Sequence, residues 1–416
     1  MNAHPAPDLR AAWHRFTRRV LGYWPDVLAF GSAIAAAVVA AVVAAALAGC
    51  GGGVEVGGTG STIASFSQGP ITGFGSIIVN GVRYDESAAR VEDDDGGVRD
   101  RSALRLGMVV QVTAGAVTDS AGTPVATATQ VRTTRALVGP ATAVDVAGGR
   151  FTMLGQVVTV TADTAFDDRL AGGLAGLAAA GPVEVYGSFD ASTGRYTATR
   201  IDVAGSGSAS KVSGPVSQID PVARTCRIGG QTYSFSALGN VSGLTEGAVV
   251  RFDLQGGQDA GGRWVVSRQG SSGLAPTDGA PAELRGRVQS LASATSFVVE
   301  GVRIDAAAAR IDGTPAVGAS VRVSGTVNAG VLVATRVQVE SASAPQAFEV
   351  EGTITSLNTA SQRFVVRNTV VSYAGPGVEF TRGSATQLAV GRKVRVEGRL
   401  AADRSVLAAT RIRIDD

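Results

Sequence analysis

Residues that carry out acid–base catalysis or bind metals are scarce in this chain. Its 416 residues include two histidines, His4 and His14, and two cysteines, Cys50 and Cys226. Histidine is the usual general base near neutral pH and the commonest metal ligand, but both copies lie near the N-terminus. The rest of the sequence cannot form a Ser-His-Asp, Cys-His or His-Glu-x-x-His arrangement. We therefore expect no enzyme activity, no catalytic residue, no cofactor and no metal centre.

Carboxylates provide the remaining options for chemistry. A hydrolase with paired carboxylates is the enzymatic alternative, but Asp and Glu occur mainly at predicted turns and strand ends, which disfavours it. The densest acidic run, Glu92-Asp93-Asp94-Asp95-Gly96, offers oxygen ligands for calcium. The run lacks EF-hand spacing, and the sequence shows no second acidic cluster. We interpret it as a solvated turn.

Arginines recur in register on the polar faces of two predicted strands in each repeated unit. Such a stripe would bind an anionic envelope polymer through bidentate contacts to carboxylate or phosphate. Alternatively, these arginines pair with acids across strands and discourage edge-to-edge association. The candidate polymer-binding residues are Arg200, Arg251, Arg322, Arg336, Arg395 and Arg411.

Nucleic acid is not an expected partner. Four arginines and two aspartates before residue 27 account for the formal net charge of +2, so the rest of the chain is close to neutral. Binding to single strands requires a basic groove and several stacking aromatics. Beyond the N-terminal segment the sequence has one tryptophan, Trp264.

The N-terminal segment has the pattern of an export signal. Arginines precede an uncharged run of mostly Ala and Val from Val27 to Ala46, which is about long enough to span a bilayer. The run ends in Leu47-Ala48-Gly49-Cys50, and here the chain resembles a bacterial lipoprotein precursor. The resemblance implies cleavage before Cys50, a thioether-linked lipid on its sulfur and acylation of its new amino group. The alternative is an uncleaved membrane helix with an incidental cysteine.

These features predict a membrane anchor and a tether. We expect a signal peptide at 1–49, then lipidated Cys50 and a flexible Gly/Ser/Thr-rich tether to residue 68. Residue 51 is Gly rather than Asp, which by resemblance to enteric sorting rules favours the outer membrane over the inner. The expected location is the cell envelope. The lipid anchor makes the membrane a partner, and envelope glycan and envelope proteins are further candidates.

A repeated unit fills the rest of the chain. Residues 76–91, SIIVNGVRYDESAARV, and 296–311, SFVVEGVRIDAAAARI, are identical at nine of sixteen positions. Similar text occurs five times, with an apolar pair before a Gly or Asn that suits a tight hairpin turn. In this apolar column Cys226 takes the place of Ile or Phe, so we interpret it as a buried apolar residue. The pairs are Ile77/Val79, Phe151/Met153, Cys226/Ile228, Phe297/Val299 and Phe364/Val366.

Alternation with period two gives each unit one dry face. Five short strands can bury that face by closing into a small OB-like barrel, in which a Leu-containing segment such as 238–247 plugs one end. A small β-sandwich or roll is the alternative. The predicted fold is all-β, with repeat 1 at 69–134, repeat 2 at 137–204, repeat 3 at 212–270, repeat 4 at 283–340 and repeat 5 at 347–416. Units this small are expected to pack together or share strands in places.

The unit resembles a bacterial family described as domain of unknown function 5666. The resemblance rests on the FVVEGVRID hairpin, the stretch LAVGRKVRVEG at 388–398 and the closing ATRV at 334–337. It implies exported repeat proteins with no agreed activity, and it supplies no catalytic residue. We expect a non-enzymatic envelope lipoprotein that serves as a spacer or binding scaffold. The alternative is a protein that binds carbohydrate or anionic envelope polymer through its arginine-bearing strand faces.

Overall fold

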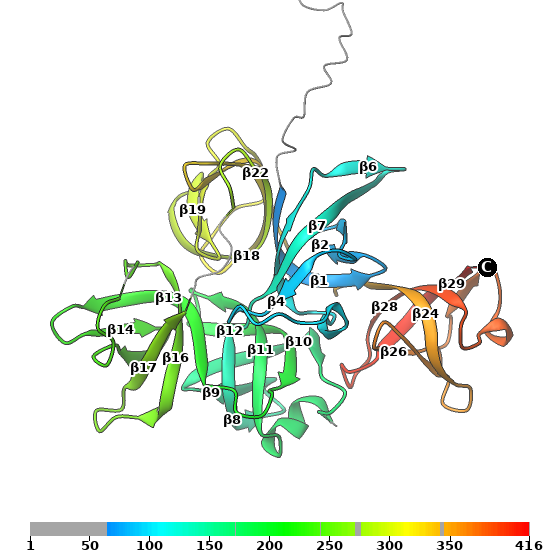
Figure 1. The fold of residues 1–416 in the computed structure, drawn as a ribbon, viewed down its shortest axis with the longest axis horizontal. Helices are drawn as coiled ribbons and strands as arrows, with labels where there is room; N and C mark the ends of the chain where they lie inside the picture. Colours follow the sequence, from blue (N-terminus) through cyan, green and yellow to red (C-terminus); the bar gives the residue numbers. More distant parts are fainter. Residues whose placement is uncertain (1–64, 171, 242, 271–275, 342–344, 416) are drawn as a thin grey trace, which may run out of the picture. The chain divides into compact units, whose positions relative to one another are not determined.

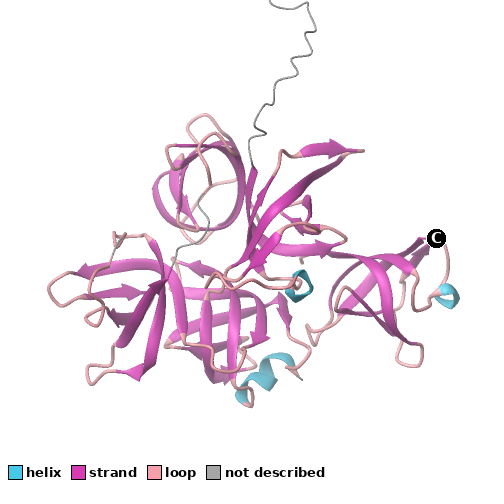
Figure 2. Ribbon diagram, viewed as in Figure 1, coloured by secondary structure: helices cyan, strands magenta, loops and turns pink. Residues whose placement is uncertain are grey.

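Figure 1 shows the computed structural model, which describes residues 65–170, 172–241, 243–270, 276–341 and 345–415. Strands dominate these residues, and the helices are three short 3₁₀ segments (Figure 2): η1 (Arg101–Ala103), η2 (Gly173–Ala178) and η3 (Ala385–Gln387). Among the described residues, no helix has the length and apolar character needed to cross a membrane. The expected signal peptide, Cys50 and the tether as far as residue 64 lie outside the described residues.

Each repeat closes into a barrel of five main strands. In repeat 1 the ring runs β1–β2–β3–β7–β5 and back to β1, and only the β3–β7 pair is parallel. The same ring with one parallel pair recurs in the other four repeats, so the predicted OB-like barrels are confirmed. The strands of repeat 1 are β1 (Ser65–Phe74), β2 (Ile77–Val79), β3 (Val82–Asp85), β4 (Arg90–Glu92), β5 (Val109–Ala114), β6 (Thr118–Ser120) and β7 (Thr123–Thr133).

The other barrels follow in chain order. Repeat 2 has β8 (Leu137–Asp145), β9 (Arg150–Met153), β10 (Gln156–Phe166), β11 (Pro182–Asp190) and β12 (Arg195–Val203). Repeat 3 has β13 (Lys211–Asp220), β14 (Thr225–Ile228), β15 (Gln231–Ser234), β16 (Val249–Gln258) and β17 (Trp264–Gly270). Repeat 4 has β18 (Pro281–Ser293), β19 (Ser296–Val299), β20 (Val302–Asp305), β21 (Arg310–Asp312), β22 (Ser320–Asn328) and β23 (Val331–Val339). Repeat 5 has β24 (Phe348–Asn358), β25 (Arg363–Val366), β26 (Thr369–Ser372), β27 (Glu379–Thr381), β28 (Lys393–Leu400) and β29 (Leu407–Asp415).

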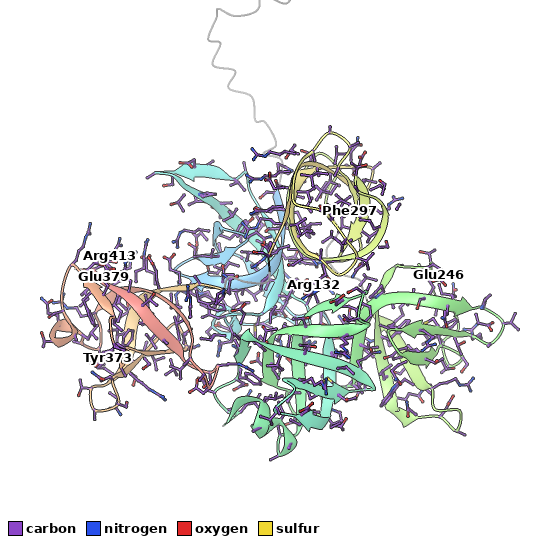
Figure 3. All side chains as sticks on the ribbon, turned by 180° about the vertical axis from the view of Figure 1, so that it is seen from behind. Arg132, Glu246, Phe297, Tyr373, Glu379 and Arg413 are labelled. Carbon is purple, nitrogen blue, oxygen red and sulfur yellow. The ribbon has the colours of Figure 1, made fainter. Side chains whose placement is uncertain are left out.

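The dry faces predicted from alternation fill the barrels. All five apolar pairs before the hairpins are buried, including Cys226, whose side chain is fully enclosed. Figure 3 shows Phe297 within the ring of strands of repeat 4, where its exposed fraction is 3%. The sequence pattern therefore identifies the core correctly. The pattern arises because one face of each short strand is buried.

Tight hairpins join the second and third strands of each barrel. Both turn residues have positive φ in four of the five turns, as a two-residue type I′ turn requires. Asn368 has φ 56°, so it replaces Gly in the turn of repeat 5 for the reason expected from the sequence. In repeat 3 the positive φ falls on the first turn residue, Gly229, at 55°, and not on the second, Gly230.

A bulge explains why the closing strand carries Ala-Thr-Arg. The ladder between the last two strands shifts beside Gly187, Gly325 and Gly398, which face Ala198, Ala334 and Ala409. A Cβ added at Gly325 would lie 2.1 Å from the carbonyl oxygen of Val333, so only glycine fits there. Thr335, which follows Ala334 in the closing strand, donates its hydroxyl hydrogen to the carbonyl oxygen of Ser324 at 3.1 Å. Small residues and a hydroxyl thus stabilise the bulge.

Strands also pair between repeats. β1 pairs in parallel with β18 at Phe66–Ala282 and with β24 at Phe74–Val350. β8 pairs with β13 at Leu137–Val212. The expected strand sharing is present, but repeat 1 pairs with repeats 4 and 5, which are distant in sequence. β1 begins at Ser65, so residues 65–68, assigned to the tether from their composition, are held in the sheet by β5 and β18.

Leu-containing segments cover barrel ends in several repeats. In repeat 2, Leu174 and Leu177 on η2 are buried against the core. In repeat 3, Leu238 and Leu244 are partly buried against the same cluster, as the sequence suggested.

Candidate functional site

The acidic turn after β4 forms a compact loop. The Asp93 carboxylate accepts hydrogen bonds from the backbone N–H groups of Asp95 at 3.0 Å and Gly97 at 2.8 Å. Arg99 donates to the other oxygen of Asp93 at 2.8 Å. This local bonding fixes the turn and directs the next two aspartates away from it, towards residues of repeats 2 and 3.

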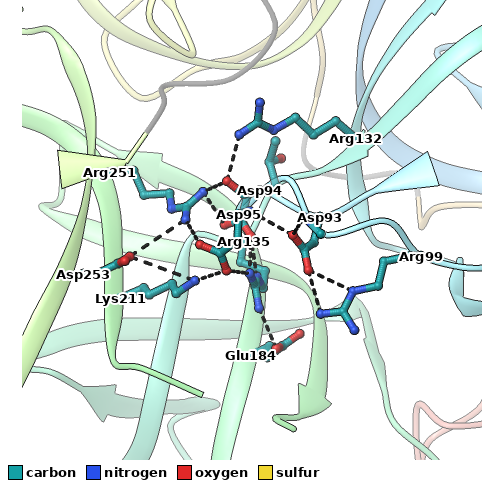
Figure 4. A network of polar contacts seen from close by, with 12 residues as sticks. Asp93, Asp94, Asp95, Arg99, Arg132, Arg135, Glu184, Lys211, Arg251 and Asp253 are labelled. Carbon is teal, nitrogen blue, oxygen red and sulfur yellow. Dashed lines mark hydrogen bonds and ion pairs between the residues drawn. The ribbon is translucent and has the colours of Figure 1, made fainter. Parts of the chain in front are cut away.

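Asp94 and Asp95 lie at the centre of an ion-pair network that joins three repeats (Figure 4). Arg135, between β7 and β8, donates to Asp94 at 2.7 Å and to Asp95 at 2.8 Å, and it also reaches Glu184 of β11 at 2.8 Å. From repeat 3, Lys211 and Arg251 bond to Asp95. We call Asp93, Asp94, Asp95, Arg135, Lys211 and Arg251 the junction cluster.

The charges of the junction cluster stabilise one another. Burial alone would raise the pKa of Asp95, but the hydrogen bond from Lys211 and the charge of Arg251 hold that pKa well below its ordinary value. Burial would likewise lower the pKa of Arg135, but the adjacent Asp94 raises it above the usual range for arginine. Asp95 and Arg135 are therefore ionised at neutral pH, and the ion pairs that they form make the cluster an electrostatic link between repeats 1, 2 and 3.

The turn is only partly solvated, contrary to the prediction, since Asp95 and Gly96 are exposed but the three acids before them are not. Glu92, Asp93 and Asp94 are all buried. The three aspartates place carboxylate oxygens within 4.8 Å of one another, a spacing that would suit a cation. Arg99, Arg135 and Lys211 already form ion pairs with those oxygens. These basic side chains therefore compensate the carboxylates, which is the role that calcium would otherwise play. The run of acids in the sequence marked this place, but the cations that pair with the Asp94 and Asp95 carboxylates lie 40 or more positions away.

The six candidate polymer-binding arginines do not form one exposed stripe. Arg200 and Arg251 are buried, with exposed fractions of 7% and 3%, because they take part in contacts between repeats. The other four keep 32% to 53% of their side chains exposed. Every one of the six has a carboxylate partner: Asp202 for Arg200, Asp94, Asp95 and Asp253 for Arg251, Glu340 for Arg322, Asp312 for Arg336, Glu349 and Glu351 for Arg395, and Glu379 and Glu397 for Arg411.

Cys226 is the free cysteine of the described residues. Burial raises the pKa of its thiol to about 12, so thiolate is scarce at neutral pH. This agrees with its interpretation as an apolar core residue.

Two clefts lie between repeats. The larger, about 630 Å³, is lined by residues of repeats 1, 2 and 5 and mixes acids with arginines, among which Arg200 pairs with Asp202 at 2.7 Å. The second, about 470 Å³, is lined by β1, β12, β18 and β22 and the start of β24. Sequence reasoning predicted neither cleft, because each is made by residues from three or more repeats.

Comparison with known proteins bears on the repeats. A family model described as Domain of unknown function (DUF5666) matches residues 138–202, 285–338 and 351–413, which are repeats 2, 4 and 5. No curated protein gave a significant match to the chain. Repeats 1 and 3, outside the matched segments, have Ala114 and Leu254 at the bulge where the matched repeats have glycine. Repeats 2, 4 and 5 are therefore tandem repeats that match the DUF5666 family.

Proposed function

We propose that this protein is a non-enzymatic cell-envelope lipoprotein, in which a membrane-tethered array of small β-barrels serves as a spacer or binding scaffold. The observation that carries the proposal is the junction cluster. Its carboxylates and basic side chains are directed at one another across repeats 1, 2 and 3, and hydrogen-bonded ion pairs of this kind hold modules in one arrangement. A spacer needs such fixed joints more than it needs a reactive site.

The proposed address follows from the Leu-Ala-Gly-Cys sequence before residue 51, with the outer membrane favoured. Replacement Cys50→Ser should abolish palmitate labelling in the bacterial host and leave the precursor unprocessed. Cys226→Ser is the matched control, since this buried thiol should not affect labelling. Continued labelling of the Cys50→Ser protein would defeat the lipoprotein assignment.

The scaffold role can be tested at the junction cluster, which links repeats 1, 2 and 3. Trypsin needs mobile backbone, so the peptide bond after Arg135 should resist cleavage while the cluster is intact. Lys211→Met together with Arg251→Met removes two cations that repeat 3 supplies to Asp95 and should expose that bond. Equal cleavage rates in the variant and the unaltered protein would show that the cluster does not fix the joint.

Binding of an anionic envelope polymer through arginines is the second candidate. It is favoured by Arg336 and Arg411, whose side chains remain about half exposed although each has an acidic partner. A pull-down with acidic glycan from the envelope should weaken when Arg336 and Arg411 are both replaced by alanine. Retention that is unaffected by these changes removes the arginine version of this function.

A further inference from the structure

The larger cleft, between repeats 1, 2 and 5, contains charged side chains that have no partner in the described part of the chain. Its volume of about 630 Å³ lies within the roughly 300–1,000 Å³ of small-molecule sites. Six arginines and five acids line it, and four of each form ion pairs, two of which are drawn in Figure 4. The pairs join Arg99 with Asp93, Arg135 with Glu184, Arg169 with Asp167 and Arg200 with Asp202. The charged groups that remain in the lining are Arg105, Arg404 and Asp168.

Arg105, which follows η1, is partly buried without an acid to offset its charge. Its Nη1 group donates to the backbone carbonyls of Ser102 and Leu104, the latter at 3.0 Å, and its Nε and Nη2 groups have no acceptor among the described residues. Burial, together with the nearby charge of Arg200, lowers the pKa of Arg105 below its ordinary value. The paired Arg135 shows the opposite shift, because Asp94 raises its pKa. The Nε–Nη2 edge of Arg105 is therefore free to bind an anion.

Asp168 is the unpaired acid of the same cleft. Its neighbours Asp167 and Arg169 pair with each other at 2.6 Å, whereas the Asp168 carboxylate accepts no hydrogen bond from the described residues. Burial raises the pKa of this carboxyl, and the charges of Arg200 and Arg105 oppose the rise only in part. Arg105 and Asp168 thus act on each other's charge but lie too far apart for a direct ion pair. A ligand that carries both charges would satisfy both side chains.

The rest of the lining adds a second cation and some apolar surface. Arg404 lies in the turn before β29, where its carbonyl accepts from the N–H of Phe166 at 3.0 Å, and its guanidinium has no acidic partner among the described residues. Val365, Val370 and Leu400 of repeat 5 are only partly buried, so a ligand can cover them. The cleft therefore suits a molecule with an anionic end, a cationic end and small apolar groups between them.

We infer that this cleft binds a short zwitterionic peptide, whose terminal carboxylate pairs with Arg105 and whose terminal ammonium group pairs with Asp168. Two parallel N–H donors of an arginine bind a carboxylate well, and Nε and Nη2 of Arg105 are such a pair. A simple anion fits less well, because it would place a second negative charge near Asp168. The inference goes beyond the proposed scaffold role, which depends on the ion pairs of the junction cluster and not on Arg105 or Asp168.

The probes are alanyl-leucine and leucyl-alanine with free ends, together with their N-acetylated and C-amidated forms, measured by calorimetry on the full-length protein at pH 7. Each capped form lacks one of the two charges and should bind about tenfold more weakly or worse. Arg105→Gln and Asp168→Asn should each weaken binding of the free peptide to a similar degree. Arg101→Gln is the matched control, because Arg101 is exposed on η1 and does not line the cleft.

The capped peptides assign each charge to its residue and keep the test decisive if a variant does not fold. C-amidation should cause no further loss in Arg105→Gln, and N-acetylation should cause none in Asp168→Asn. The inference is supported when a free peptide binds, the capped forms bind more weakly and Arg101→Gln retains binding. It is overturned if neither free peptide binds, if the capped forms bind the unaltered protein as well as the free peptides do, or if folded Arg105→Gln and Asp168→Asn keep full affinity.

Discussion

Arg135 and Asp94 form an ion pair in which each side chain is only 5% exposed. A buried pair of this kind is costly to break, because removing one partner leaves the other charge uncompensated. Arg135→Met should therefore destabilise the protein by about 3 kcal/mol or more. Urea unfolding followed by the fluorescence of Trp264, in the adjoining repeat 3, would measure the loss.

The matched control for this change is Arg150→Met. Arg150 pairs with Asp145 at 2.9 Å, but their side chains are 50% and 38% exposed. Solvent screens such a pair, so the cost should stay below about 1 kcal/mol. Similar losses in the two variants would contradict a special role for Arg135.

Glycine at the bulge is predicted to be essential for barrel closure. In Gly325→Val the new Cβ would lie 2.1 Å from the carbonyl oxygen of Val333, so the ladder between β22 and β23 must shift. We expect a loss of about 2 kcal/mol or more, measured by thermal unfolding and by faster amide exchange in β23. Gly256→Ala in β16 has open space around its Cβ and should change stability by less than about 0.5 kcal/mol.

Glu300 makes stability depend on pH. Burial raises the pKa of this carboxyl from its ordinary value of 4.5 to about 7. The unfolded state therefore loses this proton first, and stability should fall as pH rises from about 4.5 to 7 and then level off. Glu300→Gln, which retains an acceptor for the Arg287 N–H, should be more stable than the unaltered protein at pH 8 by ~2 kcal/mol.

At pH 4 the glutamine variant and the unaltered protein should unfold at nearly the same urea concentration, since Glu300 is then protonated in both states. This gives the prediction an internal control. A stability difference that is equal at pH 4 and pH 8 would show that titration of Glu300 is not its cause.

Cys226 should report the opening of repeat 3. With Cys50 replaced by serine it is the single thiol of the chain, and burial raises its pKa to about 12. Its reaction with a disulfide reagent at pH 8 should be at least about a hundredfold slower in the folded protein than in urea. Rapid reaction of the folded protein would place this thiol in contact with solvent.

The sequence was sufficient to predict the features that depend on residues close together in the chain. Alternation identified Phe297 and its equivalents as core residues, and the turn positions predicted the positive φ of Asn368. A period of two indicates which face of a strand is dry, so it determines a barrel unit but not the neighbour of that unit.

The contacts between repeats could not be predicted because they join residues far apart in the chain. Arg251 lies 156 positions beyond Asp95, and no periodicity links the two. For the same reason the acidic turn seemed solvated, since the sequence shows its charges without the cations that cover them. The burial of Arg200 and the two clefts also result from contacts between repeats, so the sequence did not predict them.

The pairing of β1 with β18 and β24 has a consequence for assembly. The first strand of the array to be synthesised completes its hydrogen bonding only when repeats 4 and 5, made last, become available. The contacts of Asn80 show how far apart in the chain such partners are, since its side-chain amide donates to the backbone carbonyl of Glu283, 203 positions later. Contacts this distant slow folding, and they make the array unlike a solenoid from which single modules can be removed. A chain truncated after repeat 3 would present β1 as an open edge, available for pairing with other molecules.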